Sequence, residues 1–563
     1  MKQIIKYTFL AIACLPALTM QGKTIKVNVN TLKGDITKEL RSIGEKTAIN
    51  DTAVLNFGKG TYTLNGTIQF WCHVIINGQG SSQTTIILND GRDQAGFKAF
   101  KDDCFIKCIG RLNHPISVSI SNISIKLKDH HGIWWEENER YAVKIYHANK
   151  VDIHHVDSYM ANAHITNFDL RVCSNVTVSD CNITNYNNSK TGGCLWIRGE
   201  AHNIMVSRNK FYKYGKDETL AFYSRLVDAN DYVRGSVTRS DIYVNNNEFH
   251  YGGEIGISKN TDAYNQMIVS LFTDHKKSSE SCTTRNFHLN NNSFFINDKC
   301  TRCLYISFDP ADHHSGIYVE NNTIVNASVK NPDKYYRQDI EVNDLSQSKD
   351  TIYINGNTIK NNNLVLNKYG THGYSFLLIQ GGNVCLDGNT ITNSVLKDPS
   401  TGKSTGVQLL WVGASGGSAV MRNNVCKGIK YISTVGAGDG TESFTLNASN
   451  NYFSGDTRVY CHKISNLHLN FTNNTFESND GNFFLQEFAS RGSLIFNNNL
   501  VSVSTGNGKL MTHWAKTSLQ SMRFDRLEVK NNKFTGVKNE YELLKNISNV
   551  GKRKVSNNII KPQ

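Results

Sequence analysis

A short motif of an apolar residue, one or more asparagines and a second apolar residue recurs along most of this chain. It reads VNNNEF at 244–249, LNNNSF at 289–294, VENNTI at 319–324 and INGNTI at 354–359. One asparagine in each copy serves as a marker, and successive markers are separated by 23 to 45 residues. The spacing between markers has a short minimum and varies widely above it. Such spacing indicates a solenoid whose turns carry loops of different length. The markers are Asn209, Asn247, Asn292, Asn322, Asn357, Asn389, Asn424, Asn451, Asn474, Asn499, Asn532 and Asn558.

Each turn of this solenoid contains three candidate strands. Alternating apolar residues precede every marker, an apolar residue two places later begins a second segment, and a third apolar segment such as CLYISF (303–308) lies upstream. Alternation predicts strands, and stacked parallel strands lie about 4.8 Å apart. The pattern therefore predicts an all-β fold, a single right-handed parallel β-helix. The chain has 67 asparagines, and those of the repeated motif are expected to turn one corner of each coil and to bond to one another as a ladder.

The first part of the chain is expected to close one end of the solenoid. Residues Asp35–Thr47 form an amphipathic pattern that predicts a capping helix, with Ile36, Leu40 and Ile43 on one face. We expect residues 23–110 to hold this cap and the first coils, and residues 111–563 to hold the coils that carry the markers. The early helix, the GKGTY turn, the INGQG turn and the coils that follow together resemble the pectin lyase-like superfamily of right-handed parallel β-helices. No specific family is indicated.

The N-terminus has the pattern of an export signal. Lys2 and Lys6 precede the apolar stretch Tyr7–Leu18, and small and polar residues follow. We expect residues 1–22 to be a signal peptide, cleaved near Ala17–Gly22, and the protein to be secreted to the periplasm, cell surface or medium of a bacterium. Anchoring as a lipoprotein at Cys14 is the alternative. No later stretch is long and apolar enough to predict a transmembrane segment.

The net charge indicates what kind of molecule the protein binds, and the positions of the cysteines bear on metal binding and disulfide bonds. The net charge of +13 indicates an acidic partner, and since no basic run of nucleic-acid type occurs, we expect an acidic polysaccharide and no nucleic acid. The protein is expected to be a monomer. Most of the 13 cysteines lie in alternating segments, where cysteine packs as a small apolar residue. The CxxC pair Cys300 and Cys303 is weak evidence for a metal or a disulfide, and the disulfide pattern is left open.

The resemblance places a binding cleft on the outer face of the strand that precedes each marker. If large apolar residues point inward there, charged and aromatic neighbours point outward. Trp134 and Trp135, in the loop KDHHGIWWEENERY, are expected to form a further platform for sugar rings. The expected substrate-binding residues are Lys144, Arg171, Trp196, Arg198, Arg225, Tyr305, Trp134 and Trp135.

The densest candidate for acid–base chemistry is SFDPADHHSG at 307–316. A histidine beside an aspartate supplies a group that titrates near neutrality. The stretch loosely resembles the Asp-Pro-His-Asp turn of β-helical mannuronan C5-epimerases, with Ala311 in place of the histidine. The expected catalytic residues are His313, His314, Asp309, Lys276 and Tyr223.

These residues favour cleavage of an acidic polysaccharide by β-elimination. Arg198 and Arg225 would neutralise the uronate carboxylate, His313, His314 or Lys276 would remove the C5 proton, and Tyr223 or Tyr305 would protonate the leaving oxygen. Ca²⁺ is compatible with this chemistry, although no acidic cage of the kind it prefers stands out, and the metal is left unknown. The alternatives are a glycoside hydrolase using two of Asp169, Asp274 and Asp309, a non-catalytic surface protein or adhesin that binds glycans, and a phage-type tailspike, against which the export signal argues.

Overall fold

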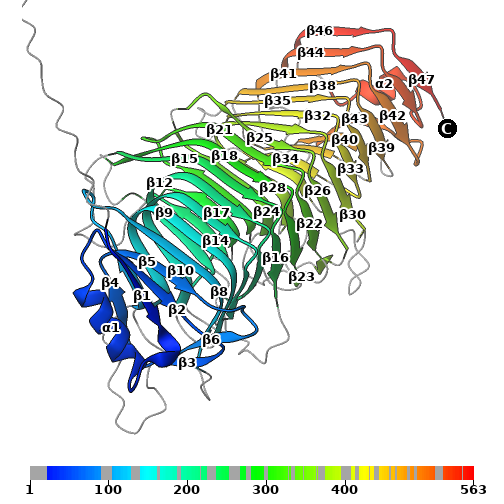
Figure 1. The fold of residues 1–563 in the computed structure, drawn as a ribbon. Coiled ribbons are helices and arrows are strands. Elements are labelled where there is room, and N and C mark those ends of the chain that lie inside the picture. The colour runs from blue at the N-terminus through cyan, green and yellow to red at the C-terminus, as the bar shows by residue number, and fades with distance from the viewer. Residues whose placement is uncertain are drawn as a thin grey trace, which may run out of the picture.

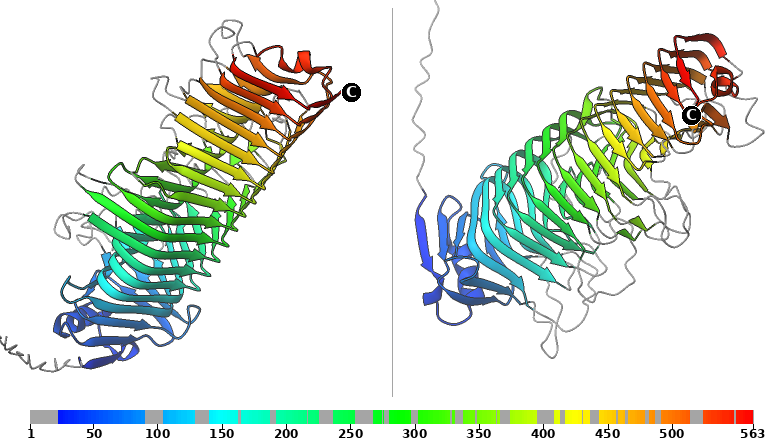
Figure 2. Two further views of the ribbon diagram at one scale, coloured as in Figure 1. Left: turned by 90° about the horizontal axis from the view of Figure 1, so that it is seen from above. Right: turned by 90° about the vertical axis from the view of Figure 1, so that its right-hand side faces the viewer.

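The chain winds into a long rod of stacked parallel strands, with the N-terminal residues at one end and the C-terminus at the other (Figures 1 and 2). The computed structural model describes residues 22–562 except 90–103, 129–139, 162–164, 187–191, 216, 225–235, 253–266, 274, 276–279, 297–301, 327–328, 331–336, 347, 363, 366–373, 395–407, 413–416, 430, 436–442, 456–457, 463–465, 479–481, 487–490, 514–523 and 548–549. Within these residues, 45 strands pair in one continuous sheet. Strands β23 (Val329–Lys330) and β27 (Leu364–Val365) form a separate pair. The expected right-handed parallel β-helix is confirmed.

The strands fall into three columns that run along the rod, and each coil contributes one strand to each column. β8, β9, β10 and β12 are long enough to bend through more than one column. The first column contains β4 (Ile68–Phe70), β7 (Cys104–Ile109), the start of β9 (Arg140–Ala161), β10 (Ile165–Ser179) and β12 (Leu195–Ser207), then β14 (Leu220–Tyr223), β17 (Met267–Phe272), β20 (Arg302–Phe308), β24 (Arg337–Asp344), β28 (Tyr374–Gln380), β31 (Gln408–Val412), β34 (Tyr431–Val435), β37 (Arg458–His462), β40 (Asn482–Gln486) and β43 (Lys509–His513).

The second and third columns follow in the same order along each coil. The second contains β1 (Thr24–Asn28), β2 (Thr52–Asn56), β5 (His73–Asn77), β8 (Ile116–Leu127), the later parts of β9, β10 and β12, β15 (Ser236–Asn245), β18 (Ser281–Asn290), β21 (His313–Glu320), β25 (Thr351–Asn355), β29 (Asn383–Asp387), β32 (Gly417–Arg422), β35 (Ser443–Ser449), β38 (Asn466–Thr472), β41 (Arg491–Asn497), β44 (Phe524–Lys530) and β46 (Val550–Ser556). The third contains β3 (Gly60–Leu64), β6 (Thr84–Leu88), the ends of β8 and β9, β11 (Asn182–Tyr186), β13 (Lys210–Tyr214), β16 (Glu248–Tyr251), β19 (Ser293–Ile296), β22 (Thr323–Asn326), β26 (Thr358–Asn361), β30 (Thr390–Asn393), β33 (Val425–Lys427), β36 (Tyr452–Ser454), β39 (Thr475–Ser478), β42 (Leu500–Val503), β45 (Lys533–Thr535) and β47 (Ile559–Lys561).

Asparagines fill the bend between the second and third columns from Asn209 to Asn558, and all except the partly exposed Asn558 are buried. In each step, the backbone N–H and the side-chain amide of one asparagine donate to the side-chain oxygen of the next. For Asn322 these bonds to Asn357 Oδ1 measure 2.9 and 3.0 Å, and its amide also donates to Leu289 O at 2.7 Å. Every step therefore satisfies backbone groups that the bend removes from the strand ladders. The expected asparagine ladder is confirmed.

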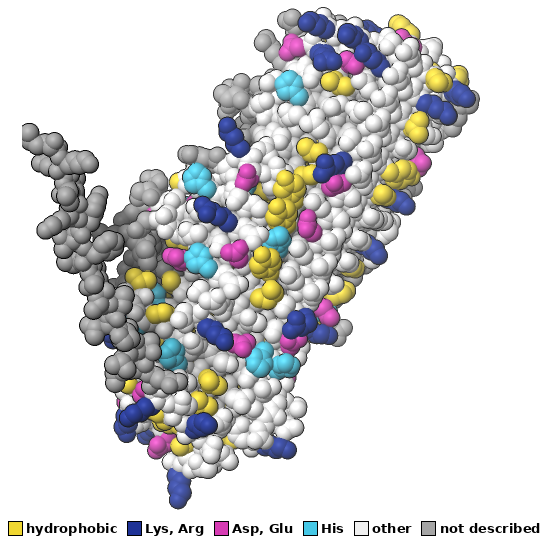
Figure 3. Space-filling model, turned by 45° about the horizontal axis from the view of Figure 1, so that its top comes forward, with side chains coloured by type: hydrophobic (Ala, Val, Ile, Leu, Met, Phe, Trp, Pro, Cys, Tyr) yellow, Lys and Arg dark blue, Asp and Glu magenta, His cyan; other side chains and the backbone are white. Residues whose placement is uncertain are grey.

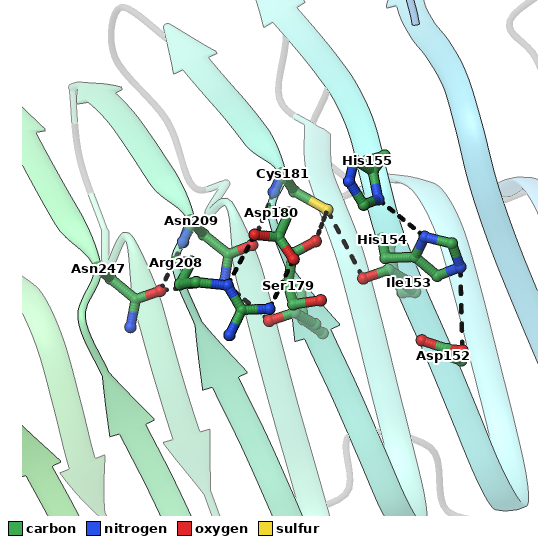
Figure 4. Close-up of polar contacts among 11 residues, drawn as sticks. Asp152, Ile153, His154, His155, Ser179, Asp180, Cys181, Arg208, Asn209 and Asn247 are labelled. Atoms are coloured by element: carbon green, nitrogen blue, oxygen red, sulfur yellow. Dashed lines mark hydrogen bonds and ion pairs between the residues drawn. The ribbon is translucent and has the colours of Figure 1, made fainter. Parts of the chain in front are cut away.

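The residue directly before each ladder asparagine takes the left-handed backbone conformation. Asn321 has φ +57° and Gly356, one coil later, has φ +64°. Asparagine and glycine adopt this conformation at low cost, which explains why the motif so often carries two adjacent asparagines. Figure 4 shows the first corner, where Arg208 takes this position and its guanidinium forms two bonds of 2.8 and 2.7 Å with Asp180.

A helix covers the N-terminal end of the rod. The helix α1 (Ile36–Lys46) begins where the Asp35 side chain accepts a bond from Thr37 N at 3.0 Å, and it lies against β4 and β3. Leu40 is fully buried, and Ile36 and Ile43 are partly buried against the same core, so the predicted capping helix is confirmed. Near the other end, a short helix α2 (Glu540–Leu544) packs on β43 and was not predicted.

Cysteines, surface charge and the lack of long apolar helices characterise the described part of the chain. Ten cysteines there are buried, and burial raises the pKa of the Cys173 thiol to about 12. Lysine, arginine and acidic side chains are scattered over the face shown in Figure 3. In the part of the chain that the structure describes, no helix is long and apolar enough to cross a membrane.

Candidate functional site

The outer face of the first column, defined as its side chains turned away from the main core, carries two rows of polar and aromatic residues. Their apolar neighbours along each strand, such as Ile145 and Leu170, belong to that core. The parallel register sets the residues of each row side by side. One row is Lys107, Lys144, Asp169, Trp196, Ala221, Ser270 and Tyr305, and the other is Tyr146, Arg171, Arg198, Tyr223, Phe272 and Ser307.

Most of the expected substrate-binding residues on this face are buried. The exposed fraction is 2% for Lys144, 1% for Arg171, 3% for Trp196 and 4% for Arg198. Alternation along a strand separates the two faces of a sheet but says nothing about what lies over the outer one. The expectation that these four side chains line an open cleft is therefore wrong, although they do share one face. Tyr223 and Tyr305 are half-buried and keep contact with solvent.

Asp169 joins two of the buried arginines. Its carboxylate lies 2.6 Å from Arg171 Nε and 3.0 Å from Arg198 Nε. The Arg171 guanidinium also donates to the hydroxyl oxygens of Tyr146 and Tyr141, at 2.6 and 3.1 Å. Buried charges persist only where ion pairs and hydrogen bonds replace the lost water. Asp169 therefore holds the two guanidinium groups in place and is not available as an exposed catalytic carboxylate.

A carboxyl–phenol pair stands at the edge of this network. The Tyr223 hydroxyl donates to Glu218 Oε2 at 2.5 Å. Burial, and after it the negative charge of Asp217, raises the pKa of Glu218 to about 7, while Arg198 opposes this shift. Burial and the Glu218 charge raise the pKa of Tyr223 well above its ordinary value. Glu218 is 5% exposed, so Tyr223 is the member of the pair that a ligand reaches.

Aromatic and cationic groups surround this pair. The Trp196 ring lies edge-on to Tyr223 with centroids 5.7 Å apart, and Phe272 lies 4.5 Å from Tyr223 on the next coil. The Arg198 guanidinium lies over Trp196 at 4.4 Å and 5.3 Å from the Tyr223 ring. These contacts fix the Tyr223 ring beside a positive charge, which is the electrostatic setting a negatively charged ligand prefers.

The segment before β12 positions Trp196 and Glu218 relative to each other. A Cβ atom on Gly193 would lie 2.1 Å from Trp196 Nε1 and 2.6 Å from Glu218 O, so only glycine fits. Gly192 N donates to Asp217 Oδ2 at 3.0 Å, and the buried Lys213 ammonium donates to Gly192 O. Burial lowers the pKa of Lys213 to about 8.

The two neighbouring histidines of the predicted catalytic turn point in different directions. His313 is exposed, whereas His314 is 3% exposed and its Nε2 lies 2.8 Å from Asp344 Oδ2. The His314 ring also stacks on Phe308 at 4.6 Å. Adjacent residues of a strand face opposite sides, so the two do not act together. The expectation of His314 as a base in the cleft is wrong because its ring lies inside the fold.

The other expected site residues divide between the described and the undescribed parts of the chain. Asp309 is half-buried, and its backbone N–H donates to Asp312 Oδ2 at 2.7 Å. Lys276, Arg225, Trp134 and Trp135 lie outside the described residues. Glu218 was not among the expected residues. The signal that could have found it is the acidic pair in KDETLAF (216–222), directly before the strand that carries Tyr223.

No protein-family model matches the sequence, and no curated protein matches it. Three similar solved structures are a family 28 exopolygalacturonase from Yersinia enterocolitica (10% identity, 80% of this chain and 78% of that chain covered, TM-score 0.43), an exopolygalacturonase from Thermotoga maritima (10%, 80% and 92%, TM-score 0.40), and the A-module of a mannuronan C-5 epimerase from Azotobacter vinelandii (10%, 90% and 98%, TM-score 0.37). They are parallel β-helix proteins of the pectin lyase-like class, which the sequence pattern resembles. At these identities, the activity of this chain has to be argued from its own residues.

Proposed function

We propose that this protein is an enzyme that cleaves an acidic polysaccharide by β-elimination at Tyr223. The observation that carries the proposal is the Tyr223–Glu218 hydrogen bond of 2.5 Å beside Arg198. It combines a ligand-accessible phenol, a buried proton acceptor and a positive charge on one face. Export, which residues 1–22 predict, would bring the protein to such polymers outside the cytoplasm.

The first requirement of β-elimination is a positive charge near the uronate carboxylate, because neutralising that group makes the C5 proton removable. Arg198 holds such a charge 5.3 Å from the Tyr223 ring. Lys107 lies on β7, three strands before Arg198 in the column and in register with Lys144. It is half-buried and adds a cation along the same face. Because Arg198 is buried and paired with Asp169, it would act on the carboxylate of a uronate at Tyr223 through its electric field and not by direct contact.

The second requirement is a proton acceptor with a pKa near the working pH. As the C5 proton moves to the Tyr223 oxygen, the phenol proton moves to Glu218. The C5–H electron pair forms the C4=C5 double bond while the C4–O bond breaks. The departing oxygen then takes the proton from Tyr223, and Glu218 returns its proton to the phenol. Glu218 thus acts through Tyr223, and no free phenolate has to form.

The test compares two substitutions in this pair with the same substitutions in a matched pair elsewhere. Tyr452 donates to Glu477 Oε2 at 2.6 Å on the exposed third column, far along the chain from the site. We expect Tyr223→Phe and Glu218→Gln to lower kcat/KM by about 100-fold or more, and Tyr452→Phe and Glu477→Gln to leave it unchanged. The substrates are a panel of uronic-acid polymers, and the readout is ultraviolet absorbance of the new double bond.

The same experiment separates the alternatives. If new reducing ends form without the absorbance of the double bond, the enzyme is a hydrolase and the proposed elimination is wrong. Retention on an immobilised polymer without any product would indicate a glycan-binding protein. Full activity in Glu218→Gln would refute the proposed proton acceptor. If Glu218 must be ionised, kcat/KM should rise with pH around an apparent pKa of about 7, the ionised fraction of Glu218 setting the rate.

A further inference from the structure

Three potential metal ligands converge at one end of the outer face of the first column. His275 follows β17, whereas Asp309 and Asp312 lie in the turn between β20 and β21. One ligand atom from each residue lies within 4.8 Å of the other two. Because β17 and β20 are neighbours in the column, the fold itself brings these two chain segments together.

Asp312 is held rigidly at the centre of this cluster. Its side chain is fully buried, Oδ1 accepts from Cys282 N at 2.7 Å, and Oδ2 accepts from Asp309 N at 2.7 Å. His275 Nε2 lies 2.7 Å from the same Oδ1. Backbone donors that orient a ligating carboxylate are typical of the outer shell of a metal site. The carboxylate keeps acceptor capacity, because each oxygen has two lone pairs.

The two other side chains leave one side of the cluster accessible. The His275 side chain is 10% exposed and Asp309 is half-buried. Three protein ligands with an accessible side are the arrangement of a metal ion that keeps a position open for water or substrate. One imidazole nitrogen with two carboxylate oxygens suits a borderline ion such as Zn²⁺, whereas Ca²⁺ prefers oxygen ligands alone and more of them.

We propose that His275, Asp309 and Asp312 bind a single Zn²⁺-class ion with an open coordination position. Its place on the fold gives it a use that rests on the proposed function. Phe272 and Ser307 continue the row of Tyr223 over the next two coils. The ion, held between these two coils beyond the ends of β17 and β20, therefore lies about 5–10 Å along the rod from Tyr223, at about 4.8 Å per coil. There it would bind the carboxylate of a uronate further along the polymer.

The experiment measures metal binding directly and does not depend on activity. Untagged full-length protein, freed of metal with a chelator, is titrated by calorimetry with ZnCl₂ and separately with CaCl₂. We expect one Zn²⁺ per chain, bound more tightly than Ca²⁺. His275→Gln and Asp309→Asn should each weaken Zn²⁺ binding by more than about 100-fold, beyond the loss typical of an outer-shell change.

A matched control and a folding check complete the test. His250 pairs with Glu248 at 3.2 Å on the third column, so His250→Gln removes an equivalent histidine and should leave the affinity unchanged. The variants must retain the wild-type melting temperature without metal, which Asp309→Asn should do because Asp312 keeps its backbone donors. Absence of Zn²⁺ binding, or equal binding in wild type and both variants, would overturn the site. Binding without elimination activity would overturn the proposed function and leave the site intact.

Discussion

Asn322→Ala tests whether the asparagine ladder holds the coils together. The Asn322 side chain is almost fully buried and takes part in four hydrogen bonds. It donates to Leu289 O and Asn357 Oδ1 at 2.7 and 3.0 Å, and it accepts from the backbone N–H and the side-chain amide of Asn292 at 2.9 and 3.0 Å. Alanine removes all four.

The expected loss in the free energy of unfolding depends on which groups lose a hydrogen-bond partner. Asn292 N loses its acceptor, Asn322 Oδ1, and Leu289 O loses the Asn322 amide as a donor. By contrast, the Asn292 amide keeps Val244 O at 2.8 Å, and Asn357 Oδ1 keeps Asn322 N at 2.9 Å. With about 1–3 kcal/mol for a buried unsatisfied donor and less for a carbonyl with a second lone pair, we expect a loss of about 2–4 kcal/mol.

Two further variants separate hydrogen bonding from packing. Asn322→Asp has the same size but turns an acceptor toward Asn357 Oδ1 and Leu289 O, so it should be at least as harmful as alanine. Asn558→Ala, at the partly exposed end of the ladder, should cost about 1 kcal/mol or less because water replaces the lost partners.

The assay has to resolve individual coils, because a long repeat array need not unfold in one step. Hydrogen exchange should accelerate at Asn292 and its neighbours in β18 and β21 and remain unchanged around Asn499. A loss below about 1 kcal/mol, or acceleration spread evenly along the rod, would refute the view that each rung stabilises its own coil.

Two other predictions concern the support of the site. Lys213 has a folded pKa of about 8 against an ordinary value of 10.5, so the folded state loses its proton first and stability should rise between about pH 8 and 10.5 by about 3 kcal/mol at 1.36 kcal/mol per pKa unit. Denaturation curves across this range should show that rise in wild type and not in Lys213→Met, and an identical slope in both would contradict the assignment. Gly193→Ala should cost about 1–3 kcal/mol through overpacking against Trp196, whereas Gly58→Ala, whose added Cβ meets its nearest neighbour at 3.4 Å, should melt like wild type; equal melting of the two variants would refute the steric argument.

The architecture was predictable because one local requirement repeats in every coil. Each bend needs a left-handed residue followed by a buried amide, and the sequence meets this need with pairs such as Asn321 and Asn322. The marker in each pair was identified from spacing, whereas the separate task of the first residue was not anticipated. The helix α2 was not predicted because its five residues are too few for a periodic pattern to emerge.

The site was harder to predict because alternation along a strand indicates which way a side chain points but not whether it is buried or what it contacts. The register places Arg171 and Arg198 side by side as the pattern requires, yet both are buried in contact with Asp169. Glu218 lies just before a strand, where no periodicity singles it out. The raised pKa that makes it useful comes from burial and from Asp217, and neither effect can be inferred from spacing.

Aromatic content alone would have pointed to the wrong face. Tyr243, His288, Tyr318 and Tyr353 form a half-exposed row on the second column, with ring centroids 4.8 to 5.3 Å apart and ring planes within 16° of parallel. Figure 3 shows hydrophobic and histidine side chains following one another along the rod.

Rings stacked in this way cover one another's faces and present their edges to solvent, whereas a sugar binds to the face of an aromatic ring. The row therefore stabilises the stacking of coils and offers little to a glycan. At Tyr223 the neighbouring rings of Trp196 and Phe272 lie at 85° and 77° to its plane, so neither of these two rings stacks on its face. The orientation of the rings, and not their number, distinguishes Tyr223 from the stacked row on the second column.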